Sequence, residues 1–171
     1  MQWVQPNYRR VMVSRQACRN RATLSSHRGH QEGWTPMITL NRLDDQVSVS
    51  PQLRRDQISA LSVNGFKAVI NHRPDDEEFN QPGHEELAQA LSAAGLANAY
   101  LPVRGLPTDT VIEASAELLA RDPGSKALFF CRSGFRSAAV WAMIRRRQGW
   151  DADDIRARAL AAGYDLSQLP L

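Results

Sequence analysis

Residues 127–137 join an apolar run to a short polar loop, and they read Ala127-Leu128-Phe129-Phe130-Cys131-Arg132-Ser133-Gly134-Phe135-Arg136-Ser137. Four consecutive apolar residues are typical of a strand buried inside a parallel sheet. The residues after the loop, 137–148, repeat apolar side chains at helical spacing and end at Gly149. The sequence therefore predicts a strand, a tight loop and a helix, with Cys131 at the carboxyl end of the strand.

Short apolar runs and helical patterns alternate along the rest of the chain from residue 37. Strands are predicted at 47–49, 66–70 and 99–103. Helices are predicted from Ser50-Pro51 to about Asn64, at 87–94, from Thr110 to the break at Asp122-Pro123-Gly124, and at 151–162. This alternation predicts an α/β fold of three layers, in which helices cover both faces of a mostly parallel central sheet. Active sites of such sheets lie at the carboxyl ends of the strands, where Cys131 is predicted.

Charge divides the chain of 171 residues into two parts. Residues 1–36 hold six arginines and one glutamate, whereas residues 37–171 hold 15 basic and 17 acidic residues. We predict a disordered basic extension at 1–36 and one folded domain at 37–171. Met37 directly precedes the patterned sequence, which favours a non-native extension. An organelle transit peptide and a basic arm for nucleic acid or membrane are the alternatives.

Several classes of protein are excluded by composition. No run of about 18 apolar residues occurs, so no membrane-spanning helix or membrane partner is predicted. The domain carries no basic stripe, so no nucleic-acid partner is predicted. Two cysteines, Cys18 and Cys131, are too few for a disulfide scaffold or a four-cysteine zinc site.

Cofactor and location follow from the same inventory. No metal-ligand set and no glycine-rich nucleotide motif is present, so neither a metal nor a cofactor is predicted. A reducing compartment suits a free Cys131 thiol, which predicts a cytoplasmic protein, with organelle targeting by residues 1–36 as the alternative. No feature of the sequence predicts an oligomeric state.

The Cys131 loop combines the parts of a nucleophile and an anion site. A helix begins directly after it, and Arg136 lies within reach, two features that favour the nucleophilic thiolate. Gly134 allows successive backbone N–H groups to turn inward and cradle an anion. We predict Cys131 and Arg136 as catalytic residues. The anion-binding loop is predicted to comprise Arg132, Ser133, Gly134, Phe135 and Ser137.

Several of the predicted site residues also have a structural interpretation. A cysteine that ends an apolar strand is often a small buried hydrophobe, but its polar neighbours here favour the catalytic interpretation. Ser137 is predicted to cap the helix, and a hydrogen bond to the Cys131 sulfur is an equal alternative. His72 is predicted to be a satisfied histidine rather than a base. Arg73, Asp75, Asp76 and Asp109 are predicted as accessory candidates, with a structural salt bridge as the alternative for Arg73.

Two resemblances rest on particular motifs. The pattern Cys-x-x-Gly-x-Arg-Ser after an apolar strand resembles the loop of rhodanese sulfurtransferases. The wider chain, from 37 to about 167, resembles the phosphatase-like domain of beta-lactamase-hydrolase-like proteins, a family of the tyrosine- and dual-specificity-phosphatase fold group. This resemblance implies a tyrosine-phosphatase-like fold and a connection to persulfides, since relatives occur joined to sulfur-oxidising domains. Its motifs include Val69-Ile70-Asn71-His72-Arg73-Pro74-Asp75, Leu101-Pro102-Val103 and Ala161-Ala162-Gly163-Tyr164-Asp165.

The chain departs from the phosphatase pattern in two places. Four residues separate Cys131 from Arg136, whereas phosphatases of this group have five. Arg104 stands where the group places the aspartate that protonates the leaving oxygen, and Asp109 is expected to belong to the following helix. A shorter loop offers fewer N–H donors, and sulfur transfer needs no such acid.

These departures lead us to expect a sulfurtransferase that carries sulfane sulfur as a Cys131 persulfide. The alternative is a phosphatase that forms a Cys131 phosphocysteine. A third hypothesis is an anion- or persulfide-binding module without turnover. The expected partner is accordingly a small sulfur anion, a persulfide or a phosphoester.

Overall fold

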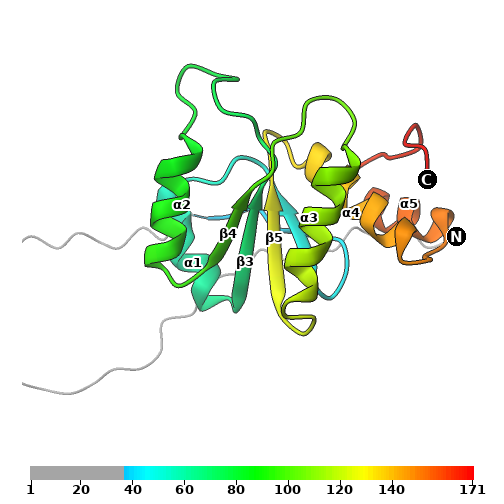
Figure 1. Cartoon of the computed structure of the whole chain (residues 1–171), viewed down its shortest axis with the longest axis horizontal. Coiled ribbons are helices and arrows are strands. Elements are labelled where there is room, and N and C mark those ends of the chain that lie inside the picture. Colours follow the sequence, from blue (N-terminus) through cyan, green and yellow to red (C-terminus); the bar gives the residue numbers. More distant parts are fainter. Residues whose placement is uncertain (1–36) are drawn as a thin grey trace, which may run out of the picture.

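The computed structural model describes residues 37–171 (Figure 1). The predicted basic extension and Cys18 lie outside the described residues, so the domain boundary at Met37 stays a prediction. No helix within residues 37–171 has the length and apolar character needed to cross a membrane.

A five-stranded sheet forms the centre of the domain, with the order β1-β2-β5-β3-β4. Its strands are β1 (Asn41–Arg42), β2 (Val47–Ser50), β3 (Phe66–Asn71), β4 (Ala97–Tyr100) and β5 (Lys126–Phe130). Every neighbouring pair is parallel except β1 with β2. The predicted α/β fold with a mostly parallel sheet is therefore confirmed.

Helices cover both faces of this sheet (Figure 1). The short helix η1 (Arg55–Gln57), α1 (Ile58–Val63) and α2 (His84–Ala93) lie on one face. The helices α3 (Asp109–Ala120), α4 (Phe135–Arg147) and α5 (Ala152–Ala161) lie on the other. Side chains of β5 alternate between the two cores, because Phe129 packs with the α3–α5 layer while Leu128 and Phe130 pack with the α1–α2 layer.

Three predicted starts of elements are wrong, and two of them change the site. Ser50 does not cap a helix, because it pairs with Phe130 as the last residue of β2, and helical structure begins only at Arg55. The segment 51–54 is thereby left beside the Cys131 loop. Ser137 does not cap α4, because Gly134 is the N-cap and Ser137 already lies within the first turn. The cap of α3 is Thr108, whose side chain accepts from the Val111 N–H, rather than Thr110.

Two strand predictions also differ from the structure. The strand expected at 99–103 lies at 97–100, because its backbone follows the register of Ala68–Asn71 in β3. The two-residue strand β1 was not predicted, since Asn41 and Arg42 have no strand-like pattern and are held there by pairing with Val49 and Ser48.

Candidate active site

The carboxyl ends of three neighbouring strands bring three segments of chain together. The segment 51–54 follows β2, the Cys131 loop follows β5, and residues 72–83 follow β3. We call residues 75–82 the acidic loop. Backbone hydrogen bonds join the segments, since Gln52 N–H donates to the Arg132 carbonyl at 3.3 Å and His72 N–H donates to the Phe130 carbonyl at 2.8 Å.

The Cys131 loop turns a backbone donor toward the sulfur. Cys131 is fully buried, and the Gly134 N–H donates to its Sγ at 3.1 Å. Gly134 adopts φ +95° and begins α4, so the positive end of a 13-residue helix lies at the sulfur. Arg132, Ser133 and Phe135 expose their side chains around this turn, so they contribute backbone to it. This geometry stabilises negative charge on the sulfur or on an anion beside it.

Gly134 is required for a second reason, which comes from the end of the chain. A Cβ at this position would lie 2.1 Å from the Tyr164 hydroxyl oxygen. That hydroxyl donates to the Ser133 carbonyl at 3.4 Å and accepts from Asn41 Nδ2 at 2.7 Å. Tyr164 and Asn41 therefore fix the back of the loop, and only glycine fits both the backbone conformation and the space.

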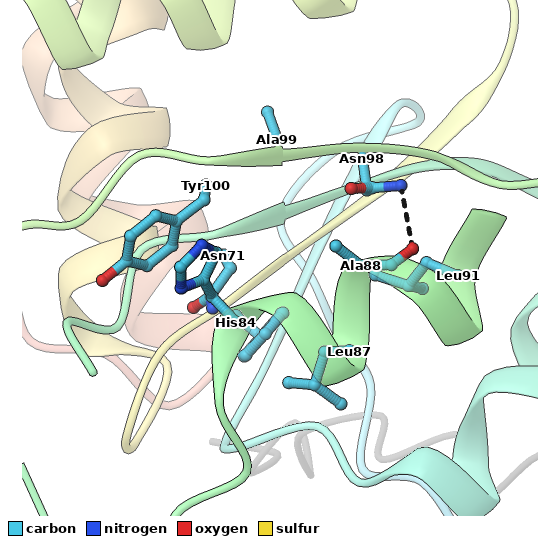
Figure 2. A pocket seen from close by; sticks show the side chains of 9 residues that line it. Asn71, His84, Leu87, Ala88, Leu91, Asn98, Ala99 and Tyr100 are labelled. Carbon is cyan, nitrogen blue, oxygen red and sulfur yellow. Dashed lines mark hydrogen bonds between the residues drawn. The ribbon is translucent and has the colours of Figure 1, made fainter. Parts of the chain in front are cut away.

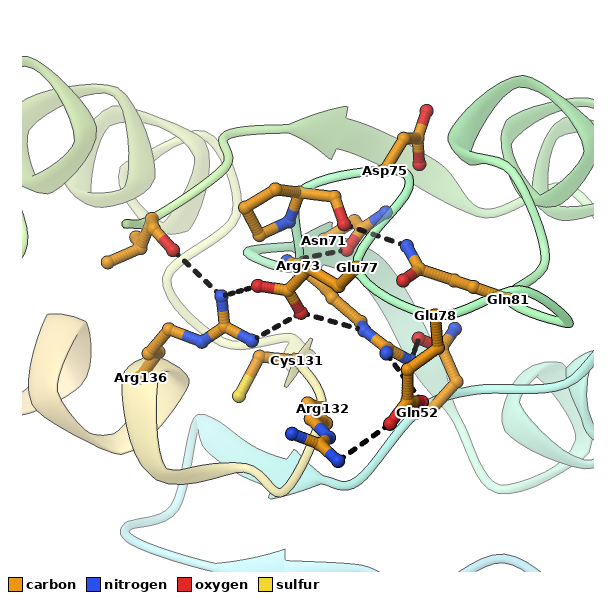
Figure 3. A network of polar contacts seen from close by, with 12 residues as sticks. Gln52, Asn71, Arg73, Asp75, Glu77, Glu78, Gln81, Cys131, Arg132 and Arg136 are labelled. Atoms are coloured by element: carbon orange, nitrogen blue, oxygen red, sulfur yellow. Dashed lines mark hydrogen bonds and ion pairs between the residues drawn. The ribbon is translucent and has the colours of Figure 1, made fainter. Parts of the chain in front are cut away.

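Arg136 is held in place by hydrogen bonds from its two terminal nitrogens, Nη1 and Nη2. Its Nη1 donates to Glu77 Oε1 at 2.7 Å and to the Val103 carbonyl at 2.9 Å, and its Nη2 donates to Glu77 Oε2 at 2.8 Å. Glu77 and, to a smaller extent, the nearby Cys131 sulfur raise the pKa of Arg136. The bond from Arg136 lowers the pKa of Glu77 to about 2, so the pair stays charged. Arg136 is thus fixed beside the sulfur (Figure 3).

The same carboxylate begins a ladder of alternating charges (Figure 3). Arg73 Nε donates to Glu77 Oε2 at 3.0 Å, and Arg73 Nη2 donates to Glu78 Oε2 at 2.7 Å. Arg132 Nη2 lies 2.7 Å from Glu78 Oε1. We call Arg136, Glu77, Arg73, Glu78 and Arg132 the arginine–glutamate ladder. It joins the acidic loop to both ends of the Cys131 loop.

His72 lies beneath the loop as a neutral imidazole. It is fully buried, and its ring nitrogens bond Ser137 Oγ at 3.1 Å and Ser115 Oγ at 3.3 Å. Burial, together with the charge of Arg136, lowers the pKa of His72 to about 3. Ser137 therefore binds His72 and, within residues 37–171, forms no hydrogen bond to Cys131. His72 supports the first turn of α4 rather than taking up a proton near neutral pH.

Two of the three aspartates named from the sequence have partners outside the Cys131 loop, and the third is exposed. Asp75 accepts from the His84 backbone at 3.0 Å and from its ring at 2.5 Å, and that ring stacks on Tyr100 (Figure 2). Asp76 is exposed with φ +63°, and Asp109 lies in the first turn of α3, where it pairs with Arg147. Within residues 37–171, none of them bonds Cys131 or Arg136.

Arg73 is the one accessory candidate that joins the Cys131 loop, through the ladder. The alternative predicted for Arg73, a structural salt bridge to the acidic loop, is confirmed. Sequence reasoning did not name its three partners, Glu77, Glu78 and Gln52, as site residues. A signal was available for two of them, because they belong to the acidic run that directly follows Arg73. The part of the chain that the structure describes has no group of three His, Cys, Asp or Glu side chains placed to hold a metal ion.

Comparison with known sequences finds relatives over most of the domain. The family described as "Beta-lactamase hydrolase-like protein, phosphatase-like domain" matches residues 39–148. The beta-lactamase hydrolase-like protein of Xylella fastidiosa is 33% identical over 128 residues, which cover 74% of this chain and 30% of that protein. That of Agrobacterium fabrum is 30% identical over 127 residues, 73% of this chain and 29% of that protein. The chain thus spans about 30% of the length of these curated relatives.

Solved structures with the same fold are described as phosphatases. A candidate phosphatase from Neisseria meningitidis superposes with a TM-score of 0.64 at 31% identity, covering 74% of this chain and 90% of that chain. The phosphatase PTPMT1 in complex with PI(5)P superposes with a TM-score of 0.63 at 19% identity, covering 76% and 89%. The second likeness shows the fold alone.

Proposed function

This chain belongs to the family of the beta-lactamase hydrolase-like phosphatase-like domain, as its motifs indicated, and on that premise we propose that it hydrolyses phosphate monoesters through a phosphocysteine on Cys131. The observation that carries this proposal is the fixed arrangement of Cys131, the Gly134 N–H and Arg136. A phosphoryl group at the sulfur would meet a helix N-terminus and a guanidinium that is already in position. The family and the phosphatase fold support the proposed chemistry.

The proposed reaction has two steps at the phosphorus atom. The Cys131 thiolate attacks phosphorus, a P–S bond forms, and the ester P–O bond breaks, so that the leaving oxygen carries the electron pair away. Water then attacks phosphorus, its proton passes to solvent, and the P–S bond breaks to release phosphate and restore the thiolate. Backbone N–H groups of the loop and Arg136 stabilise the negative charge in both steps.

We expect the rate of this reaction to depend on the acidity of the alcohol that leaves, because within residues 37–171 no acid is placed to protonate it. Arg104 occupies the position where an acid was expected, and it is exposed. Glu77 is a poor acid because both its oxygens bond Arg136 and its pKa is about 2. We therefore expect aryl phosphates and other esters of acidic alcohols to react much faster than alkyl phosphates.

Sulfur transfer is the second candidate, and two observations favour it. The loop keeps four residues between Cys131 and Arg136, and within residues 37–171 no aspartate side chain bonds the sulfur. In this reaction the thiolate attacks the outer sulfur of thiosulfate, a new S–S bond forms, and sulfite leaves with the electron pair of the old one. Sequence analysis favoured this chemistry, but the family and the structural neighbours support the phosphatase instead.

Two measurements on the same protein separate the candidates. The first is hydrolysis of 4-nitrophenyl phosphate, and the second is intact mass after brief exposure to thiosulfate or glutathione persulfide. We expect hydrolysis by the wild type and by Cys18→Ser, which serves as the matched cysteine control, and none by Cys131→Ser. A gain of one sulfur atom on the wild type without phosphate hydrolysis would overturn the phosphatase in favour of the sulfurtransferase. Anion binding with neither reaction would favour the binding module.

A further inference from the structure

A cavity of about 560 Å³ is lined by Gln52, whose backbone N–H donates to the Arg132 carbonyl of the Cys131 loop. Gln52 and Arg54, which follow β2, form one wall, and residues 78–82 of the acidic loop form the other. Arg73 also lines the cavity, although only 2% of its side chain is exposed. The cavity therefore places a nearly buried guanidinium against open space next to the proposed catalytic residues.

Two arginines line this cavity, and a third pairs with a residue of its lining. Arg73, which follows β3, and Arg54, which follows β2, belong to the lining, and Arg132 pairs with the lining residue Glu78. Arg54 is exposed and pairs with Asp56 at 3.2 Å, so its guanidinium can turn toward a bound anion. Guanidinium groups converge in this way on phosphate, which they bind through two parallel N–H bonds.

Glu78 holds the position that an anion would take. One carboxylate oxygen accepts from Arg73 Nη2 at 2.7 Å, and the other lies 2.7 Å from Arg132 Nη2. Its side chain is 46% exposed, unlike that of Arg73, so it can leave without uncovering an apolar core. If Glu78 leaves, Arg73 Nη2 and Arg132 Nη2 lose the carboxylate that they share, while Arg73 keeps its bonds to Glu77 and Gln52.

Arg132 connects the lining of the cavity to the Cys131 loop. Arg132 is the residue after Cys131, and its carbonyl accepts from the N–H of Gln52, a residue of the cavity lining, at 3.3 Å. We propose that this cavity is a second anion subsite, built on Arg54, Arg73 and Arg132, and that the substrate carries a second phosphate group which displaces Glu78 there. This inference rests on the proposed phosphatase function, because it places the scissile phosphate at Cys131.

Binding of non-hydrolysable phosphonates tests the subsite without requiring turnover. Isothermal titration of the full chain would compare propylphosphonate with methylenebisphosphonate and propane-1,3-bisphosphonate. The readout is the ratio of the monophosphonate Kd to the Kd of the tighter bisphosphonate. We expect a ratio of about ten or more, because a second set of charge-assisted hydrogen bonds forms.

Exposed side chains provide the variants, so folding is not at risk, and circular dichroism verifies it. Glu78→Gln should raise the ratio at least about threefold, because it removes the competing carboxylate charge. Arg54→Ala and Arg132→Ala should lower it toward one. Arg104 is an exposed arginine on the loop after β4 and does not line the cavity. The control variant Arg104→Ala therefore removes one positive charge outside the lining of the cavity and should leave the ratio unchanged.

Three results would overturn the subsite: a wild-type ratio near one, an unchanged ratio in Glu78→Gln, or an equal fall of the ratio in Arg104→Ala. Tight bisphosphonate binding in a protein that hydrolyses no aryl phosphate would support the subsite and reject the phosphatase. Hydrolysis of an aryl phosphate by a protein whose ratio is one would support the phosphatase and reject the subsite.

Discussion

Two arginine–carboxylate pairs in this domain have hydrogen bonds of similar length, but one pair is buried in the core and the other is partly exposed at the candidate site. Arg145 Nε donates to Asp44 Oδ2 at 2.7 Å, and both side chains are less than a tenth exposed. The same carboxylate accepts from Trp141 Nε1 at 2.7 Å and from the Val47 N–H at 2.7 Å. The pair of Arg136 with Glu77 is about one-fifth exposed on both sides and lies beside the Cys131 sulfur.

This difference leads us to expect that the Arg145–Asp44 pair stabilises the fold and that the Arg136–Glu77 pair positions Arg136 at the candidate site. Burial by itself raises the pKa of Asp44, but bonds from Arg145 and Trp141 outweigh it and the pKa lies below its ordinary value. Asp44 lies in the turn between β1 and β2 and is bound by two residues of α4, whereas Glu77 lies in the acidic loop and binds two arginines of the ladder. Loss of the first pair should reduce stability, and loss of the second should reduce activity.

Asp44→Ala tests the structural pair, and we expect the largest effect here. It leaves the Arg145 charge buried without its carboxylate, which should lower the free energy of unfolding by about 3–5 kcal/mol. Urea denaturation measures it. Asp45→Ala, at the exposed neighbouring position, is the control and should change stability by less than about 0.5 kcal/mol. Equal effects of the two variants would remove the distinction.

Arg136→Lys tests the pair at the site. Lysine keeps the charge but cannot bind Glu77 and an oxyanion through one planar group, so kcat/KM for 4-nitrophenyl phosphate should fall about 10²–10³-fold. The midpoint of urea unfolding should stay close to that of the wild type. Arg104→Lys is the matched control, with an expected change within about twofold. A loss of stability as large as that of Asp44→Ala would contradict the comparison.

Glu77→Gln separates positioning of Arg136 from mere contact. The weaker bonds to the guanidinium should lower kcat/KM about 30-fold, and the affinity for orthovanadate should fall in parallel. Glu77→Asp, which keeps the charge on a shorter side chain, should give an intermediate value. Tighter vanadate binding in Glu77→Gln would mean that Glu77 competes with the oxyanion instead of positioning Arg136.

His72 should give the smallest effect, visible only as a pH dependence. Its pKa is about 3 in the folded protein against an ordinary value of 6.5, so below pH 6.5 the unfolded chain binds a proton that the folded one does not. Stability is therefore complete above pH 6.5 and falls by up to about 1.4 kcal/mol per pH unit as the pH decreases toward 5. Urea midpoints at several pH values measure this slope, which should flatten in His72→Gln. The same slope in both proteins would contradict it.

The Cys131 loop illustrates how far the sequence alone could predict the site. Cys131, Gly134 and Arg136 lie within six residues, so a strand, a glycine turn and a helix start bring them together through local geometry. The fold class followed in the same way from alternating patterns. Ser137 was misplaced because an N-cap depends on where the helix starts, and the left-handed Gly134 moves that start three residues earlier.

The acidic loop shows the limit. Asp75, Asp76, Glu77 and Glu78 are consecutive carboxylates, and their order gives no indication of which ones turn toward Arg136. Glu77 lies 59 residues from Arg136 in the chain. Asp75 is taken by His84 at the start of α2, and the left-handed turn at Asp76 separates it from Glu77 and Glu78, which reach the arginines.

Sequence by itself determined the layered α/β fold and the family, and it picked out Cys131 and Arg136 as candidates, because apolar period, turn residues and short spacings are local properties of the chain. The tertiary structure alone decided which carboxylates hold Arg136, that Tyr164 closes on Gly134, and that a cavity opens beside Arg73. These contacts depend on the parallel pairing that places the carboxyl ends of β2, β5 and β3 side by side. No local sequence pattern predicts which strands become neighbours.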